Sequence, residues 1–167
     1  MTLSRKIMIF GIPGSGKSTF ASLLSQKLNI PLEHLDSYFF IDNWVERDKT
    51  QFLQIQETLV SKESWIIDGN AIRSLEVRFQ RADIALYFRF SRLLCLWRVL
   101  KRFFHKNQLG KAEGCPAKIS WKFLRYLWNF DARVRPVLQE LQKKHPQVQV
   151  YELRRKEDVE SWSSSFL

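Results

Sequence analysis

The chain has 167 residues, of which 45% are apolar and 14% aromatic, and its formal net charge is +10. This length and apolar content exclude a disordered chain and predict one domain over residues 1–167 with a full hydrophobic core. No stretch approaches the roughly 20 apolar residues of a membrane span, and the first residues lack the apolar core of a signal peptide. We therefore expect a cytoplasmic protein without a membrane partner. Cys95 and Cys115 have no histidine at ligand spacing, so neither a zinc site nor a disulfide framework is indicated.

The first predicted element is a strand over residues 6–10, and a helix is predicted over residues 17–28. Between them the sequence reads Gly-Ile-Pro-Gly-Ser-Gly-Lys-Ser, which is the P-loop pattern. Backbone N–H groups of such a loop surround phosphates at the positive end of the helix dipole. We predict that ATP binds here, with Lys17 on its β- and γ-phosphates and Ser18 on Mg²⁺. The predicted phosphate-binding residues are Gly11, Pro13, Gly14, Ser15, Gly16, Lys17, Ser18 and Thr19.

The second predicted strand covers residues 32–35 and is followed directly by Asp36, and then by a helix over residues 47–61. Ligands of open parallel sheets bind at the carboxyl ends of the strands, so Asp36 is expected to face the same crevice as the P-loop. There it can accept a proton from an attacking hydroxyl group or order a Mg²⁺-bound water. The alternative for Asp36 is a cap or turn. His34 is expected on the opposite face of the strand, packed against other residues.

The third predicted strand, residues 65–67, ends in Asp68-Gly69, the form of a Walker B carboxylate. Downstream of a P-loop, such an acid holds Mg²⁺ directly or through water, although an aspartate at a strand end can also simply form a turn. We predict Asp68 and Ser18 as the metal-binding residues. A helix is predicted over residues 74–80, and the predicted acceptor-binding residues around it are Asn70, Arg73 and Arg78, together with Asp36.

A fourth strand is predicted over residues 84–88, followed by a helix over residues 91–105. Arg98 and Arg102 lie one turn apart on a basic face of that helix. Opposite a P-loop, two such arginines can clamp a triphosphate and stabilise the transferring phosphoryl group. A solvated basic face is the alternative interpretation.

Nearly all of the excess positive charge falls between Arg89 and Arg125, where ten basic residues accompany a single acid, Glu113. A segment with this charge faces an anionic partner or solvent, and weak non-specific nucleic-acid binding is expected from it. The turn-rich residues 108–116 interrupt the segment and are predicted to belong to a lid at about residues 103–125.

The remaining predicted elements are a helix over residues 117–144, a strand over residues 148–153 and a helix over residues 156–165. Strands that alternate with helices predict an α/β fold with three layers, in which helices cover both faces of a parallel sheet.

These motifs resemble the nucleoside monophosphate kinase and shikimate kinase group of P-loop proteins. Asp68-Gly69 matches the Asp-Gly turn of adenylate kinases. The pair Arg98 and Arg102 matches two arginines that open the lid of that family, the first stacking on adenine and the second contacting phosphate. The resemblance also implies a catalytic, phosphate-contacting role for Arg135, within Arg133-Val-Arg135-Pro136.

A longer set of strings resembles the family labelled DNA topology modulation protein, described as adenylate-kinase-related, from about Arg5 to Arg155. The strings are Gly-x-Pro-Gly-Ser-Gly-Lys-Ser, His-Leu-Asp, Trp-Ile-Ile-Asp-Gly-Asn, Arg-Ala-Asp, Cys-Leu-Trp-Arg-Val-Leu-Lys-Arg, Gly-Cys-Pro and Phe-Leu-Arg. The resemblance implies a five-stranded parallel sheet in the order 2-3-1-4-5 with a helical lid. The chain departs from the family pattern at Arg89 to Ser91, where an aspartate and a proline are expected, and at Ala71, where a tyrosine is expected.

The leading interpretation is a small-molecule or nucleotide kinase that transfers the γ-phosphate of ATP to an acceptor. Its catalytic residues would be Lys17, Asp36, Arg98, Arg102 and Arg135. The alternative is an ATP-binding, DNA-associated regulator that uses the basic segment at residues 89–125. The chain carries no Asn/Thr-Lys-x-Asp guanine motif, which argues against a GTPase.

Overall fold

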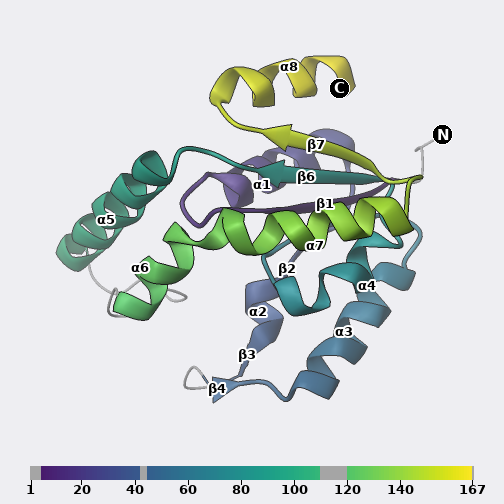
Figure 1. Cartoon of the computed structure of the whole chain (residues 1–167), viewed down its shortest axis with the longest axis horizontal. Helices are drawn as coiled ribbons and strands as arrows, with labels where there is room; N and C mark the ends of the chain where they lie inside the picture. The colour runs from purple at the N-terminus through teal and green to yellow at the C-terminus, as the bar shows by residue number, and fades with distance from the viewer. Residues whose placement is uncertain (1–4, 42–44, 110–119, 167) are drawn as a thin grey trace.

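The computed structural model describes residues 5–41, 45–109 and 120–166 (Figure 1). Its main sheet contains five parallel strands in the order β2-β5-β1-β6-β7. Numbered by their succession along the chain, these strands follow the order 2-3-1-4-5, which confirms the predicted α/β fold. The strands are β1 (Lys6–Gly11), β2 (Leu32–His34), β5 (Trp65–Asp68), β6 (Ile84–Phe88) and β7 (Gln149–Leu153).

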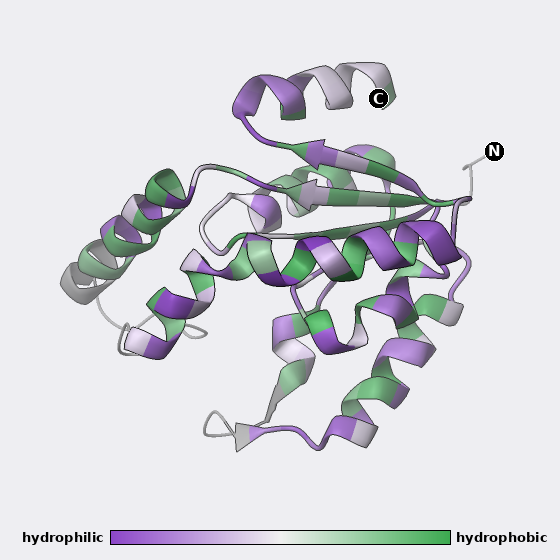
Figure 2. Ribbon diagram, in the orientation of Figure 1, coloured by the Kyte–Doolittle hydropathy of each residue, from purple (hydrophilic) through white to green (hydrophobic). Residues whose placement is uncertain are grey.

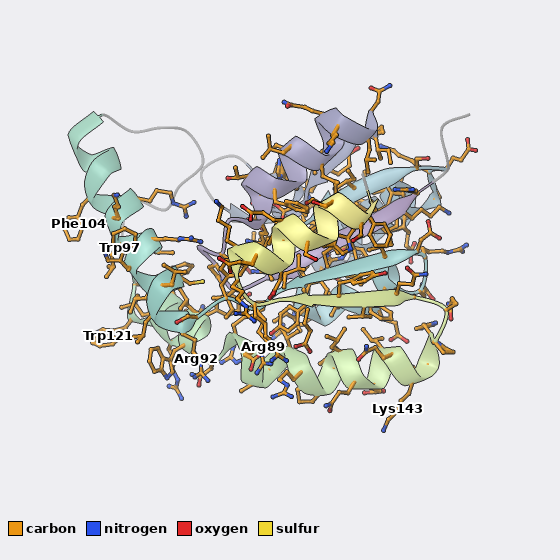
Figure 3. All side chains as sticks on the ribbon, turned by 90° about the horizontal axis from the view of Figure 1, so that it is seen from above. Arg89, Arg92, Trp97, Phe104, Trp121 and Lys143 are labelled. Carbon is orange, nitrogen blue, oxygen red and sulfur yellow. The ribbon has the colours of Figure 1, made fainter. Side chains whose placement is uncertain are left out.

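Helices cover both faces of this sheet. In Figure 1, α7 (Phe130–Lys144) crosses the face turned to the viewer, and the view of Figure 3 places α1 (Lys17–Leu28) and α8 (Lys156–Phe166) on the opposite side. Strands β1, β5 and β6 are covered on both sides, so they are buried and almost entirely apolar. The further helices are α3 (Lys49–Ser61), α4 (Leu75–Phe79), α5 (Arg92–Leu109) and α6 (Trp121–Trp128). Among the described residues, none of the helices is apolar over a length that could cross a bilayer.

The register of the strands brings the ends of β1, β2 and β5 to one edge of the sheet. Asp68 pairs in register with Ile9 on one side and with His34 on the other, and Gly11 pairs with Phe88. The P-loop and the segments after β2 and β5 therefore begin side by side. Parallel pairing of these strands is what gathers distant parts of the sequence into one crevice.

The segment after β2 differs from the prediction. The second strand ends at His34, and Leu35 begins a short helix, α2 (Leu35–Phe39), followed by the two-stranded antiparallel pair β3 (Phe40–Ile41) and β4 (Val45–Glu46). Leu35 is buried, and a Cβ built on Gly69 would lie 2.6 Å from the Leu35 Cβ. Close packing against the turn after β5 thus places Asp36 in the first turn of a helix and not at a strand end.

The long helix predicted over residues 117–144 is in fact two helices, α6 and α7. Asn129 separates them with a backbone near the bridge region (φ −94°, ψ 7°), and its side-chain Nδ2 donates to the carbonyl oxygen of Arg125. A side chain that caps the end of its own helix competes with continuation of that helix. Helix α5 runs four residues beyond its predicted end. Of the lid predicted at about residues 103–125, the two ends lie in α5 and α6, whereas residues 110–119 lie outside the described residues. The lid therefore stays a prediction, as does the single domain over residues 1–167.

Arg89, which departs from the family pattern, belongs to a polar network between the sheet and α7. Its Nε and Nη2 donate to the two carboxylate oxygens of Asp131 at 2.7 and 3.0 Å, and the Tyr87 hydroxyl donates to Asp131 at 2.7 Å. Burial alone would raise the pKa of Asp131, but these hydrogen bonds hold that pKa below its usual value. The network therefore fixes the start of α7 against β6.

Substitution of Asp131 with asparagine is expected to lower the free energy of unfolding by about 2 kcal/mol at neutral pH. The reason is that Arg89 donates to both carboxylate oxygens, and an asparagine side chain has only one oxygen to accept these two hydrogen bonds. Because the pKa of Asp131 is lower in the folded state, its contribution is present above about pH 4 and is lost as the pH falls through the folded-state value. Urea unfolding of the wild type and the variant between neutral and acidic pH measures both effects. Glu140→Gln, at an exposed position of the same helix that pairs with Lys144, is the matched control and should cost under about 0.5 kcal/mol. An equal loss in the two variants would contradict the role of the network.

Candidate functional site

The P-loop connects β1 to α1 and leaves open space at its centre. Gly16, the residue that precedes α1, has a φ of 91°, and a Cβ built on it would meet no atom within 4 Å. No side chain caps the first N–H groups of α1, so they are available to an anion. Gly14, with a φ of 85°, has a different requirement, because a Cβ there would lie 2.6 Å from the carbonyl oxygen of Cys95 in α5. The loop thus needs glycine at Gly16 because of its positive φ, and at Gly14 also because of the close contact with α5.

Lys17 and Ser18, in the first turn of α1, lie beside the carboxylate of Asp68. The Asp68 side chain is only 4% exposed, and its Oδ1 atom is buried without a hydrogen-bond partner among the described residues. Burial by itself would raise the pKa of Asp68, but interactions with His34, Lys17 and Ser18 hold the pKa below its usual value. Asp68 is therefore ionised and presents one unused oxygen beside a hydroxyl and an ammonium group.

This arrangement fits Mg²⁺. The described residues contain no group of three or more His, Cys, Asp or Glu side chains that could enclose a metal ion. An ion with few protein ligands, which keeps waters and substrate phosphate oxygens, is the form in which Mg²⁺ binds at nucleotide sites. Asp68 Oδ1 and the Ser18 hydroxyl are the groups that would hold it, directly or through water.

The structure contradicts the prediction that His34 lies on the opposite face of the strand. Its side chain is 44% exposed and turns toward the site, with Nδ1 3.1 Å from Asp68 Oδ2. This hydrogen bond raises the pKa of His34 above its usual value. His34 is the last residue of β2 and pairs in register with Asp68, and in-register residues of neighbouring parallel strands point to the same face of the sheet, so the two side chains meet. The signal available in the sequence is the spacing of His34 and Asp36, because residues two apart in a strand face the same side of the sheet.

The turn after β5 is held by Asn70 and Arg78. Asn70 Oδ1 accepts a hydrogen bond at 3.0 Å from the backbone N–H of Gly11, which ties this turn to the first residue of the P-loop. Arg78 has no exposed surface, and its guanidinium donates to the carbonyl oxygens of Gly69 and Ala71 at 2.8 and 3.1 Å. Burial lowers the pKa of Arg78 to about 10, so the group is charged at neutral pH. The structure therefore corrects the prediction that Arg78 lines an acceptor pocket, because Arg78 supports the turn from within the core.

Two of the remaining predicted acceptor residues, Asp36 and Asn70, act on Tyr126 of α6, which was not among the predicted acceptor residues. Burial raises the pKa of Tyr126 to about 12, and Asn70 and Asp36 both interact with its hydroxyl group. Asp36 itself is exposed in the first turn of α2. Arg73 is exposed on a 3₁₀ turn, Ile72–Ser74. Asp36, Asn70 and Tyr126 thus come from three separate elements and lie together beyond the P-loop.

The three predicted catalytic arginines have different positions. Arg98 reaches the P-loop, where its Nη1 donates to the carbonyl oxygen of Ser15 at 3.4 Å, and its guanidinium lies 5.7 Å from the centre of the Phe90 ring. Arg102 is exposed one turn farther along α5. Arg135 is exposed on α7, where its charge helps to lower the pKa of Asp131. The structure brings Arg98 to the P-loop, and among the described residues it gives Arg135 no bond to that loop.

Comparisons with known proteins identify the fold. No protein-family model matches the chain, and no curated protein matches it. The solved structures that resemble it include a sugar kinase from a Janibacter species, with a TM-score of 0.57 and 15% identity over 97% of this chain and 93% of that one. They also include shikimate kinase from Bacteroides thetaiotaomicron, with a TM-score of 0.56 and 15% identity over 96% and 94% of the two chains. A shikimate kinase from Acinetobacter baumannii, solved with shikimate, has a TM-score of 0.52 at 15% identity over 99% and 92%. At this identity the likeness shows the fold, which is the P-loop fold of shikimate kinases.

Proposed function

We propose that the protein is an ATP-dependent kinase that transfers the γ-phosphoryl group to a small molecule or nucleotide with a free hydroxyl group. The observation that supports this most strongly is the buried Asp68 Oδ1, which has no hydrogen-bond partner within the part of the chain that the structure describes and lies beside Lys17 and Ser18 next to the P-loop. A buried carboxylate oxygen without a partner is costly unless a ligand completes it. The kinase fold of the structural neighbours supports the same interpretation.

Each residue has a role that follows from its position. The P-loop N–H groups and Lys17 would hold the β- and γ-phosphates of ATP, and Ser18 and Asp68 would hold Mg²⁺, which when bound neutralises phosphate charge. Arg98, already at the carbonyl oxygen of Ser15, would stabilise the charge on the transferring group, and Arg102 would join it from the next turn. His34 fixes Asp68 through Oδ2, so that Oδ1 is the oxygen left for the metal.

The acceptor would bind between Asp36 and Tyr126. There Asp36 would accept the proton of the acceptor's hydroxyl group while the oxygen of that hydroxyl group forms a bond to the γ-phosphorus. The bond from that phosphorus to the oxygen bridging the β-phosphate breaks, and ADP leaves with the electron pair. Asn70 and Arg73 would orient the acceptor. A role for Arg135 on the phosphates remains a prediction, as does membership of the DNA topology modulation family.

The proposal is tested by a screen for ADP release from ATP and Mg²⁺ in the presence of nucleosides, nucleoside monophosphates, sugars and small hydroxy acids. We expect one class of acceptor to raise ADP release well above the rate with water alone, and we expect the product to carry the phosphoryl group. If no class of acceptor raises ADP release, and the protein binds duplex DNA tightly and in an ATP-dependent way at physiological salt, the result would instead support the DNA-associated regulator. Weak DNA binding at low salt decides nothing, since any protein of this charge shows it.

A further inference from the structure

Helices α5 and α6 carry an unusual concentration of exposed apolar side chains. Eight large apolar residues of the described chain are exposed, and two of them, Leu23 and Leu53, lie singly on α1 and α3. The other six form what we call the α5–α6 surface: Leu93, Leu94, Trp97, Phe104, Trp121 and Trp128. Isolated exposed apolar residues are ordinary, whereas a group of this kind marks a binding surface.

The two helices project from the end of the sheet, and their apolar residues recur along their length (Figure 2). Figure 3 shows Trp97, Phe104 and Trp121 turned to the same side, away from the strands. Trp121 is the most exposed of the set, at 86%. The exposed side chains of this surface therefore project from the molecule, and they could insert into a flat surface of a partner.

The charged residues of α5 and α6 are all basic. The sequences of α5 and α6 contain no aspartate or glutamate. Lys101 Nζ lies 5.0 Å from the centre of the Trp97 ring, and the Arg92 guanidinium lies 5.4 Å from the centre of the Trp128 ring. Charge complementarity thus requires an anionic partner, and the cations stand directly beside the aromatic rings that would contact it.

These features favour one occupant over two others. A second copy of the chain would bring two acid-free basic surfaces together, which like-charge repulsion opposes. Single-stranded nucleic acid is bound by stacking of bases on open aromatic faces, but leucine cannot stack and cations lie over Trp97 and Trp128. An anionic bilayer accepts Trp, Phe and Leu at its headgroup and acyl boundary, while Lys and Arg bind its phosphates.

We propose that the α5–α6 surface binds the surface of an anionic phospholipid bilayer. Peripheral binding of this kind needs no membrane-spanning helix, and this proposal replaces the expectation from the sequence that the protein has no membrane partner. Arg98 contacts the P-loop from α5, whereas the neighbouring Trp97 is exposed. The protein would therefore lie on the bilayer by the side of α5 turned away from the phosphate cradle, and the cradle would stay accessible.

Co-sedimentation with lipid vesicles tests the proposal. We expect the full chain to bind vesicles of phosphatidylcholine with about one-third phosphatidylglycerol, but not phosphatidylcholine alone, with binding that weakens as salt is raised. The double variant Trp97→Ser with Phe104→Ser should partition at least about tenfold less, because the apolar side chains that enter the bilayer are gone. Lys101→Gln, which removes the cation beside the Trp97 ring, should lower partitioning about fivefold. The matched control, Leu23→Ser with Leu53→Ser, removes exposed apolar residues elsewhere and should bind as the wild type does.

Circular dichroism and the melting temperature establish that each variant is folded, and Trp121→Ser, at the most exposed position, replaces the double variant if that one is not. The proposal is overturned if the wild type stays in solution with anionic vesicles at low salt, or if the double variant binds like the control. It is also overturned if the wild type forms oligomers that the double variant does not form. Loss of binding to a single-stranded oligonucleotide in the double variant, without vesicle binding by the wild type, would assign the surface to nucleic acid instead.

Discussion

Replacement of Asp36 by asparagine is expected to lower phosphoryl transfer by about 10²–10⁴-fold, which is the usual contribution of a general base. The carboxylate is exposed in the first turn of α2, and its charge acts on Tyr126 and Arg78 across the site. An amide of the same shape keeps the packing of Leu35 but cannot take the proton of the acceptor. The rate of ADP formation with the acceptor found by the screen measures the loss.

ATP binding should change by no more than a fewfold in the same variant, because Asp36 follows β2 and stands outside the P-loop. Glu57→Gln, which removes an exposed acid on α3, is the matched control and should leave the rate unchanged. Unaltered turnover by Asp36→Asn would show that Asp36 is not the general base and that it serves only at the start of α2.

Lys17→Ala is expected to remove most of the affinity for ATP while the protein remains folded. Lys17 lies in the first turn of α1, where its side chain is partly exposed, so its loss creates no cavity in the core. Bound Mg-ATP stabilises the wild type by about 2.7 kcal/mol at a hundredfold excess over Kd. Thermal melts with and without Mg-ATP should therefore show a clear rise in melting temperature for the wild type and little rise for the variant.

Lys27→Ala removes an exposed lysine from the last turn of the same helix and should keep the full response to Mg-ATP. If Lys17→Ala responds as strongly as the wild type, Lys17 is not the phosphate ligand. Together with the Asp36 variant, this separates binding of the nucleotide from transfer of its phosphoryl group.

The sequence determined the fold class and the P-loop between β1 and α1 because both depend on local patterns. Alternating apolar runs and helical stretches predicted the parallel sheet, and the resemblance supplied its order. The glycine pattern between β1 and α1, and Asp68 at the end of β5, required no knowledge of distant residues. Errors at element ends, such as Leu35 in α2 and the break at Asn129, came from packing and from a side-chain cap that periodicity does not report.

Only the tertiary structure decided which polar side chains meet. Burial of Arg78 depends on the turn at Gly69 folding over it, and His34 reaches Asp68 because β2 ends in register with β5. The contact between Arg98 and Ser15 joins residues far apart in the chain. Such contacts depend on the order and register of strands and on how α5 packs, and no local pattern carries that information. The sequence thus named the P-loop residues and Asp68, and the fold decided which of the other polar side chains reach them and which support the turns around them.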